Sequence, residues 1–241
     1  MNATNRKPVR DPRYIEGVLA SLPLMEGVGR PVIRELSTQS TLVVAKRGET
    51  VVRRGDPVRS VYAIAYGAIK ERLRRAGSSE VVLALLRQGE TFAEVPALLA
   101  CPANIDAVAL TDSMLVVINA ACISAQTLSD PRLARNISKG LARRMQALLL
   151  EFERGMLPSV QRVALYLDSI AEPAEIPGTW VARLPVSKTL LAARLDIKKE
   201  TLSRALRELA RRGLISVARR EIRIFDRGGL TGVSEAHPAT Q

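Results

Sequence analysis

Glu200, Ser203 and Arg204 are the residues of this sequence whose types and spacing best suit a defined chemistry. A glutamate on a helix can accept a hydrogen bond from cytosine N4, and an arginine one turn away can donate two to guanine O6 and N7, so the pair can read adjacent base pairs. Lys199 precedes them and is a fourth candidate reader. Alternatively, Glu200 and Arg204 form an i,i+4 ion pair on an exposed helix, worth only about 0.2–0.5 kcal/mol.

A helix from Ile197 to Arg212 would carry these residues. A second helical segment is predicted upstream, from Ser187 to Leu195, with Ser187 as its N-cap and Asp196 opening the connection. Two short helices joined by a tight turn are typical of a helix-turn-helix. Lys198 stands where a Ser or Thr cap is expected for the second helix. The apolar residues of that helix recur at helical spacing on one face, namely Leu202, Ala205, Leu206 and Leu209.

The run LISVARREIRIF after this helix predicts two short strands around residues 218–220, which form a small hairpin or wing. With the helix pair and the wing present, base reading is favoured over the simple ion pair. Basic residues in the same region are candidate phosphate contacts, which contribute affinity and salt dependence but no sequence choice: Lys188, Lys198, Arg219 and Arg220.

The overall charge agrees with a polyanionic partner. Lys and Arg number 36 against 24 Asp and Glu, which gives a formal net charge of +12 and a pI of about 10.5. A basic surface that only aids solubility is the alternative, and the neighbouring helix pair disfavours it. We therefore expect double-stranded DNA as a partner.

Upstream, residues 41–119 contain short β-branched runs punctuated by glycine, which predict a small barrel or roll. Residues 128–156 are predicted to form one long helix, with Pro131 in its first turn. Leu141, Met145, Leu148 and Phe152 are spaced four, three and four along it, as in a coiled-coil seam. A helix that covers the roll would show the same stripe. Dimerisation is favoured because a two-fold dimer places two reading helices in major grooves about 34 Å apart.

These patterns predict an α+β chain with four parts: a sensor domain at 1–127, a dimerisation helix and hinge at 128–157, a DNA-binding domain at 158–228, and a disordered tail at 229–241. No apolar run is long enough to span a bilayer, and the first residues lack a signal-peptide core, so a cytoplasmic protein without membrane contact is expected. We find no Ser/His/Asp set, phosphate loop or metal cluster, and we expect neither an enzyme nor a metal site.

With these residues in place, the chain resembles the CRP/FNR family of bacterial transcription regulators. The resemblance rests on GETVVRRGDPVRSVYAIAYGAIKE at Gly48–Glu71, GETFAE at Gly89–Glu94, LARRMQ at Leu141–Gln146 and KETLSRALRELARRGLI from Lys199. It implies a β-roll of the cyclic-nucleotide-binding type, a long dimerisation helix, a C-terminal winged helix-turn-helix, a homodimer, and RNA polymerase as a partner. The pattern E-x-x-S-R resembles the FNR/FixK/DNR branch and implies an inverted repeat near TTGAT-N4-ATCAA.

The resemblance also bears on the signal that the sensor domain detects. In relatives that bind cyclic AMP, a glutamate holds the ribose and an Arg-Ser pair binds the phosphate. Glu94 is retained here, but the pair is replaced by Asn104 and Ile105, so the phosphate would lose its charged partner. The positions that meet adenine are Leu148 and Leu149. Cyclic AMP is therefore not the expected signal.

Other cofactors are constrained by composition. Cys101 and Cys122 cannot supply the four cysteines of an iron–sulphur cluster, and His237, the only histidine, lies outside the predicted sensor domain. Haem stays open, without an obvious histidine ligand, because the Leu, Met and Phe stripe would suit an apolar cofactor as well as a core. Cys101 is either a redox switch or inert packing. Control by protein abundance, without any signal, also stays open.

A second function from another class is a nucleotide-binding regulatory module whose helix-turn-helix makes protein contacts. The two hypotheses differ in one observable property. A DNA-binding regulator should bind a TTGAT palindrome in a salt-dependent manner, whereas a protein-contact module should not.

Overall fold

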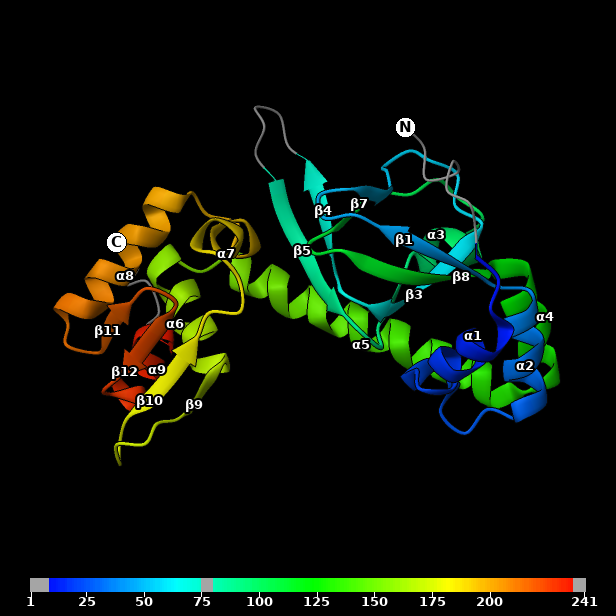
Figure 1. Ribbon diagram of the computed structural model, residues 1–241. Helices are drawn as coiled ribbons and strands as arrows, with labels where there is room; N and C mark the ends of the chain where they lie inside the picture. Colours follow the sequence, from blue (N-terminus) through cyan, green and yellow to red (C-terminus); the bar gives the residue numbers. More distant parts are fainter. Residues whose placement is uncertain (1–8, 75–79, 236–241) are drawn as a thin grey trace. The chain divides into compact units, whose positions relative to one another are not determined.

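The computed structural model describes residues 9–74 and 80–235 (Figure 1). The chain divides into two compact units, Met1–Ala147 and Leu148–Gln241, and the division falls within one long helix. Each unit has its own hydrophobic core. Among the described residues, no helix combines the length and the apolar character needed to cross a membrane.

The first unit is built around two antiparallel four-stranded sheets that enclose its core. The strand order is β1-β8-β3-β6 in one sheet and β2-β7-β4-β5 in the other. Ile64, Ile69, Phe92 and Leu115 come from both sheets and are fully buried. The predicted roll is therefore confirmed. Its strands are β1 (Thr41–Ala45), β2 (Thr50–Val52), β3 (Ser60–Tyr66), β4 (Ala68–Arg74), β5 (Glu80–Arg87), β6 (Thr91–Phe92), β7 (Asp106–Ala109) and β8 (Ser113–Asn119).

Gly67 connects β3 to β4 in a conformation that other residues avoid. Its φ is +95°, and a Cβ atom there would lie 2.3 Å from Ser113 Oγ. The turn therefore needs glycine for both its backbone angle and its close approach to β8.

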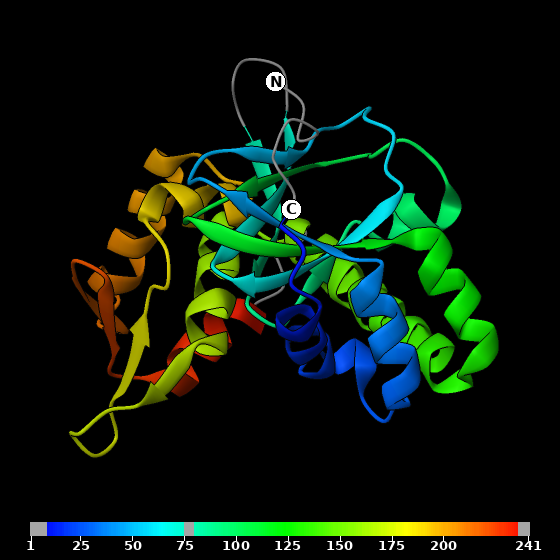
Figure 2. The same ribbon diagram turned by 45° about the vertical axis from the view of Figure 1, so that its right-hand side comes forward.

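Helices gather at one end of the roll, where α1 (Pro12–Ala20), α2 (Arg30–Thr38) and α4 (Ala120–Ser129) lie side by side in both views (Figures 1 and 2). A single 3-10 turn, η2 (Pro23–Met25), joins α1 to the segment before α2. The short helix α3 (Glu94–Leu99) follows β6 and packs on β3 and α4.

The predicted single helix from Leu128 to Met156 is wrong at its start. Leu128 belongs to α4, and the long helix α5 (Pro131–Gly155) begins after Asp130, whose backbone is extended. Proline disfavours a helical conformation in the residue before it. The Asp130 carboxylate also accepts hydrogen bonds from the backbone N–H groups of Gly29 (2.8 Å) and Arg132 (3.0 Å), which fixes the break.

After the long helix, the described residues of the second unit form three helices and a four-stranded sheet of order β11-β12-β10-β9, followed by a final helix. Leu167, Leu209, Ile222 and Ile224 are fully buried in its core. The elements after α5 are α6 (Ser159–Ser169), β9 (Ala171–Pro173), β10 (Trp180–Arg183), α7 (Lys188–Arg194), α8 (Lys199–Arg211), β11 (Ile215–Ala218), β12 (Glu221–Ile224) and α9 (Arg227–Glu235).

The predicted disordered tail is wrong for residues 229–235, which belong to α9. Leu230 is fully buried in the core of the second unit, and the Asp226 carboxylate accepts a hydrogen bond from Gly229 N (2.8 Å) at the start of the helix. Arg227 pairs with Asp168 (2.6 Å) and lies 4.1 Å from the centre of the Trp180 ring. These contacts offset the weak helix propensity of a Gly-rich segment. Residues 236–241, including His237, lie outside the described residues.

Candidate functional site

The predicted helix pair is confirmed as α7 and α8, and its turn has a defined geometry. Ser187 caps α7 by accepting a hydrogen bond from Leu190 N (3.3 Å). Asp196 in the turn has a φ of +50°, a conformation that aspartate tolerates better than most residues. The Arg162 guanidinium, from α6, donates to the carbonyl of Leu195 (2.8 Å). This arginine was not predicted to hold the turn, because its partner lies far along the sequence.

The two faces of α8 differ in burial. Leu202, Ala205, Leu206 and Leu209 are buried, which confirms the predicted apolar face. The four candidate base readers, Lys199, Glu200, Ser203 and Arg204, are all exposed. Among the described residues, neither Glu200 nor Arg204 has an ion-pair partner. The i,i+4 pair considered above is therefore not formed.

The ion pairs of α8 lie at its C-terminal end instead. Glu208 pairs with Arg211 and, at 3.0 Å, with Arg212. At the N-terminal end, Lys198 is the cap residue but makes no side-chain hydrogen bond to the helix, as expected for a lysine. The first turn of α8 thus presents unbonded N–H groups, which is a favourable place for a phosphate oxygen.

Two more candidate phosphate contacts lie at the tip of the wing, the hairpin formed by β11 and β12. β11 and β12 pair as an antiparallel hairpin, with Arg219 and Arg220 exposed in the turn between them. Arg219 has a φ of +53°, and the carbonyl of Arg220 accepts a hydrogen bond from Leu184 N (2.8 Å), which ties the turn to the end of β10. Lys188, the first residue of α7, is half-buried, whereas Lys198, Arg219 and Arg220 are exposed.

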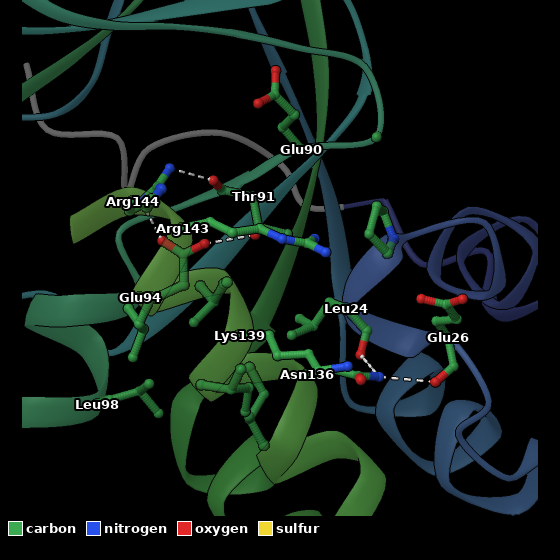
Figure 3. A pocket seen from close by; sticks show the side chains of 17 residues that line it. Leu24, Glu26, Glu90, Thr91, Glu94, Leu98, Asn136, Lys139, Arg143 and Arg144 are labelled. Carbon is green, nitrogen blue, oxygen red and sulfur yellow. Dashed lines mark hydrogen bonds and ion pairs between the residues drawn. The ribbon is translucent and has the colours of Figure 1, made fainter. Parts of the chain in front are cut away.

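In the first unit, Glu94 is already bound by a neighbour from α5. The Arg144 guanidinium pairs with Glu94 Oε2 (2.8 Å) and donates to the carbonyl of Thr91 (2.7 Å), while Thr91 Oγ1 donates to Glu94 Oε1 (2.5 Å) (Figure 3). Arg144 belongs to the LARRMQ motif, but sequence reasoning gave it no role. Glu94 precedes Arg144 by 50 residues in the sequence, so the pair becomes evident only when α5 packs on the roll.

Glu71 adds a second carboxylate beside Arg144. It lies on β4, is only 7% exposed, and its Oε2 is 3.9 Å from an Arg144 nitrogen. Burial raises the pKa of Glu71; the Arg144 cation opposes this shift, and the negative charges of Glu94 and Glu90 add to it. The carboxylates of Glu71 and Glu94 therefore share the Arg144 cation.

Asn104 and Ile105, two of the other predicted effector residues, do not line the cavity that Glu94 lines. A cavity of about 260 Å³ in the first unit is lined by Glu94 and by residues of α5, but neither Asn104 nor Ile105 lines it (Figure 3). Asn104 is exposed and Ile105 is half-buried in the loop before β7. Leu148 and Leu149 belong to the second compact unit, and each is 54% exposed.

The predicted seam of α5 is an exposed apolar stripe. Met145, Leu148 and Phe152 are 64%, 54% and 66% exposed, whereas Leu141 is half-buried beside the cavity. Leu133, further upstream on α5, is the residue that the core of the roll buries completely. Met145 therefore does not cover the roll.

The two cysteines occupy different environments. Cys101 is half-buried and Cys122 is buried on α4, where burial raises the pKa of its thiol and the nearby Glu35 carboxylate raises it further. Such a thiol is less readily ionised and less reactive. Within the part of the chain that the structure describes, no cluster of three His, Cys, Asp or Glu residues is arranged to hold a metal ion.

Comparison with known proteins assigns both units. The family model of the cyclic nucleotide-binding domain matches residues 42–128, and that of the Crp-like helix-turn-helix domain matches residues 161–233. Together the two matches cover more than half of the chain. The first lies on the roll and α4, and the second runs from α6 to α9.

Two curated relatives and one solved structure are similar to most of the chain. The transcriptional regulatory protein btr of Bordetella pertussis is 27% identical over 194 residues, 78% of each chain. The CRP-like cAMP-activated global transcriptional regulator of Mycobacterium tuberculosis is 23% identical over 215 residues, 88% of this chain and 96% of the relative. FixK2 from Bradyrhizobium japonicum has a similar fold, with a TM-score of 0.65 at 21% identity over 83% of this chain and 99% of that structure. Because the two domain models together match more than half of the chain and the similar proteins are transcription regulators, the chain belongs to the CRP/FNR family of DNA-binding transcription regulators.

Proposed function

We propose that this regulator binds, as a homodimer, an inverted repeat near TTGAT-N4-ATCAA, as in the FNR/FixK/DNR branch. Glu200 and Arg204 carry the proposal, because both are exposed on α8 without an ion-pair partner among the described residues. An unpaired arginine and glutamate one turn apart are free to contact guanine and cytosine edges in the major groove. Ser203 and Lys199 lie beside them and complete the reading edge.

Phosphate contacts position this edge on the duplex. Lys198 stands at the uncapped start of α8, Lys188 at the start of α7, and Arg219 and Arg220 at the tip of the wing. Such contacts release counterions, so the affinity falls steeply as salt rises. RNA polymerase is the partner that the family resemblance implies once the regulator is bound.

The homodimer forms through the stripe of α5. One reading helix contacts too few base pairs for useful specificity, and two-fold symmetry places a second helix on the other half-site. The exposed residues Met145, Leu148 and Phe152 supply the apolar surface that a coiled-coil dimer buries.

The signal that controls the dimer is not cyclic AMP. Asn104 and Ile105 replace the phosphate-binding pair, and the Glu94 carboxylate is already held by Arg144 and Thr91. We propose a different small molecule, a redox or gas signal, or control by abundance. An absorption spectrum of protein purified without oxygen separates a bound chromophore such as haem from a colourless dimer.

Fluorescence anisotropy with labelled duplexes tests the function. We expect tight binding to the TTGAT palindrome, weak binding to a scrambled duplex of equal length, and a large loss of affinity between about 50 and about 200 mM salt. Cyclic AMP added to the same titration should leave the affinity unchanged. Equal affinities for both duplexes would contradict sequence-specific binding, and a cyclic-AMP response would contradict the proposed signal.

A further inference from the structure

Lys139 and Arg143 stand one helical turn apart on α5 and both line the cavity beside the roll (Figure 3). Neither has an ion-pair partner within the described part of the chain, whereas the adjacent Arg144 is taken up by Glu94. Two free cations at i,i+4 repel each other, which costs a few tenths of a kcal/mol on a helix. A bound anion would remove that cost.

Part of the cavity wall is apolar and is already in place. Val61 and Ile123 are each 1% exposed, and Ile137 packs against the core of the roll. Asn136 donates to the carbonyls of Leu24 (3.1 Å) and Glu26 (2.8 Å), so the wall formed by that segment is tied to α5. Small-molecule sites commonly combine such an apolar wall with polar groups that fix the orientation of the ligand.

The acidic residues around the cavity do not neutralise this pair of cations. Glu94 is engaged by Arg144, and Glu90 accepts a hydrogen bond from Arg87 N (2.7 Å), with its carboxylate turned away from Arg143 in Figure 3. Glu26 lies on the far side of Asn136 in the same view. Lys139 and Arg143 are thus the polar groups available to a ligand.

We propose that this cavity binds a small organic anion whose carboxylate pairs with Lys139 and Arg143 and whose apolar or aromatic body packs on Val61, Ile123 and Ile137. The volume of about 260 Å³ suits a molecule of one or two rings. Asn104 and Ile105, at the positions of the family's phosphate-binding pair, do not line it. A small organic anion would then be the chemical class of the signal. Only its effect on DNA binding rests on the proposed function; binding of the anion itself does not.

The two cations are separate from the proposed dimer surface. Residues two apart on an α-helix point about 200° apart, so Lys139 lies opposite Leu141, and Arg143 opposite Met145. A substitution of the cations therefore changes the cavity without placing a new group in the stripe.

Isothermal titration of the full chain with 2-naphthoate and with its uncharged amide, 2-naphthamide, tests the site. We expect saturable binding of one naphthoate per chain, at least about tenfold tighter than the amide, because two charge-assisted contacts are lost in the amide. The double variant Lys139→Gln, Arg143→Gln should lose at least about tenfold in naphthoate affinity and keep its amide affinity. Arg135→Gln, an exposed arginine of α5 that does not line the cavity, is the matched control and should bind naphthoate as the wild type does.

A second variant tests the location of the ligand independently of charge. Gly140 also lines the cavity, and a Cβ atom there would meet no other atom within 4 Å. Gly140→Leu should fold, because leucine favours a helix more than glycine does, and should lose both naphthoate and naphthamide binding by filling the space.

Three results would overturn the proposal: no naphthoate binding, equal affinity for the acid and the amide, or unchanged naphthoate binding in the double variant. Palindrome titrations with the same proteins keep the two proposals apart. A wild-type protein that binds naphthoate but does not prefer the palindrome would contradict only the proposed DNA sequence. A wild-type protein that prefers the palindrome but does not bind naphthoate would contradict only the anion site.

Discussion

Charged side chains in this protein differ chiefly in whether a partner already holds them. Glu94 and Arg144 are paired within the first unit, and Glu208 is paired with two arginines at the end of α8. Glu200 and Arg204 have no such partner among the described residues, although they lie on the same helix as Glu208. Paired charges contribute to the fold, and unpaired ones are available to a ligand.

Replacing Arg204 by Ala should cost about 1–3 kcal/mol in binding to the TTGAT palindrome, because two hydrogen bonds to guanine are lost. Binding to scrambled DNA should change little. Arg211→Ala, on the same helix but already paired with Glu208, is the control and should affect both duplexes to the same small extent. Parallel titrations measure this, and equal losses on both duplexes for Arg204→Ala would refute base reading.

Glu71→Gln should stabilise the protein relative to the wild type increasingly as the pH rises above the ordinary carboxyl pKa of 4.5. Burial raises the pKa of Glu71 above its ordinary value of 4.5, with Arg144 opposing, so the folded carboxyl favours its proton. The stability associated with that proton is present below the unfolded pKa and is lost as the pH passes the folded pKa. Glutamine does not titrate, so its melting temperature should exceed that of the wild type most at high pH.

Glu80→Gln should show the opposite sign. Burial raises the pKa of Glu80, but hydrogen bonds from Lys70 and Arg72 and their positive charges outweigh it and lower the pKa overall. The stability from this carboxylate is present above the unfolded pKa and is lost as the pH falls through the folded pKa. The variant should therefore melt below the wild type at neutral pH, with the difference shrinking in acid. If the two variants differed from the wild type in the same direction with pH, one of the two assignments would be wrong.

Among the helices, α8 has a well-packed apolar face but an uncapped N-terminus. Its four buried apolar residues fix its orientation on the second unit, but Lys198 leaves the first N–H groups without a side-chain cap. α7, by contrast, begins with a capping serine. The first turn of α8 thus lacks the stabilisation that a side-chain cap would give. A phosphate oxygen could accept hydrogen bonds from its free N–H groups instead.

Lys198→Ser should stabilise the free protein by about 0.5–2 kcal/mol, because serine at this position caps the helix. The same change should weaken binding to palindromic and scrambled DNA alike and reduce the salt slope by about 1, since one phosphate contact is lost. Thermal unfolding and salt-dependent titration measure the two effects. A gain in stability with an unchanged salt slope would show that Lys198 contacts no phosphate.

At the scale of the molecule, the chain joins a roll to a winged helix-turn-helix through one helix that belongs to both compact units. The apolar stripe of α5 crosses the division, with Met145 in the first unit and Leu148 and Phe152 in the second. A partner that buries the stripe would therefore contact both units at once.

Leu148→Glu should convert the proposed dimer to a monomer, because each dimer would bury two unpaired carboxylates, and the dimer dissociation constant should rise at least about 100-fold. Gln146→Glu adds the same charge to α5, two residues before Leu148 and thus on the other side of the helix, and should leave the dimer intact. Analytical ultracentrifugation distinguishes these outcomes. A wild-type monomer, or a dimer in Leu148→Glu, would exclude the stripe as the interface.

Several features were determined by the sequence alone, because their causes are local. The buried face of α8 follows from four apolar residues at helical spacing, and the strands of the roll follow from β-branched runs between glycines. The exposed charges at Glu200 and Arg204 follow from the same helical period. Each of these patterns is complete within about a dozen residues.

Other features were decided by tertiary structure, because each depends on a partner far along the chain. The break at Asp130 depends on Gly29, the pairing of Arg144 depends on Glu94, and the order of α9 depends on the core that buries Leu230. The cavity beside Lys139 and Arg143 likewise exists only where α5 meets the roll. Local propensity cannot predict such contacts, because their stabilisation arises from packing between elements that the sequence places far apart.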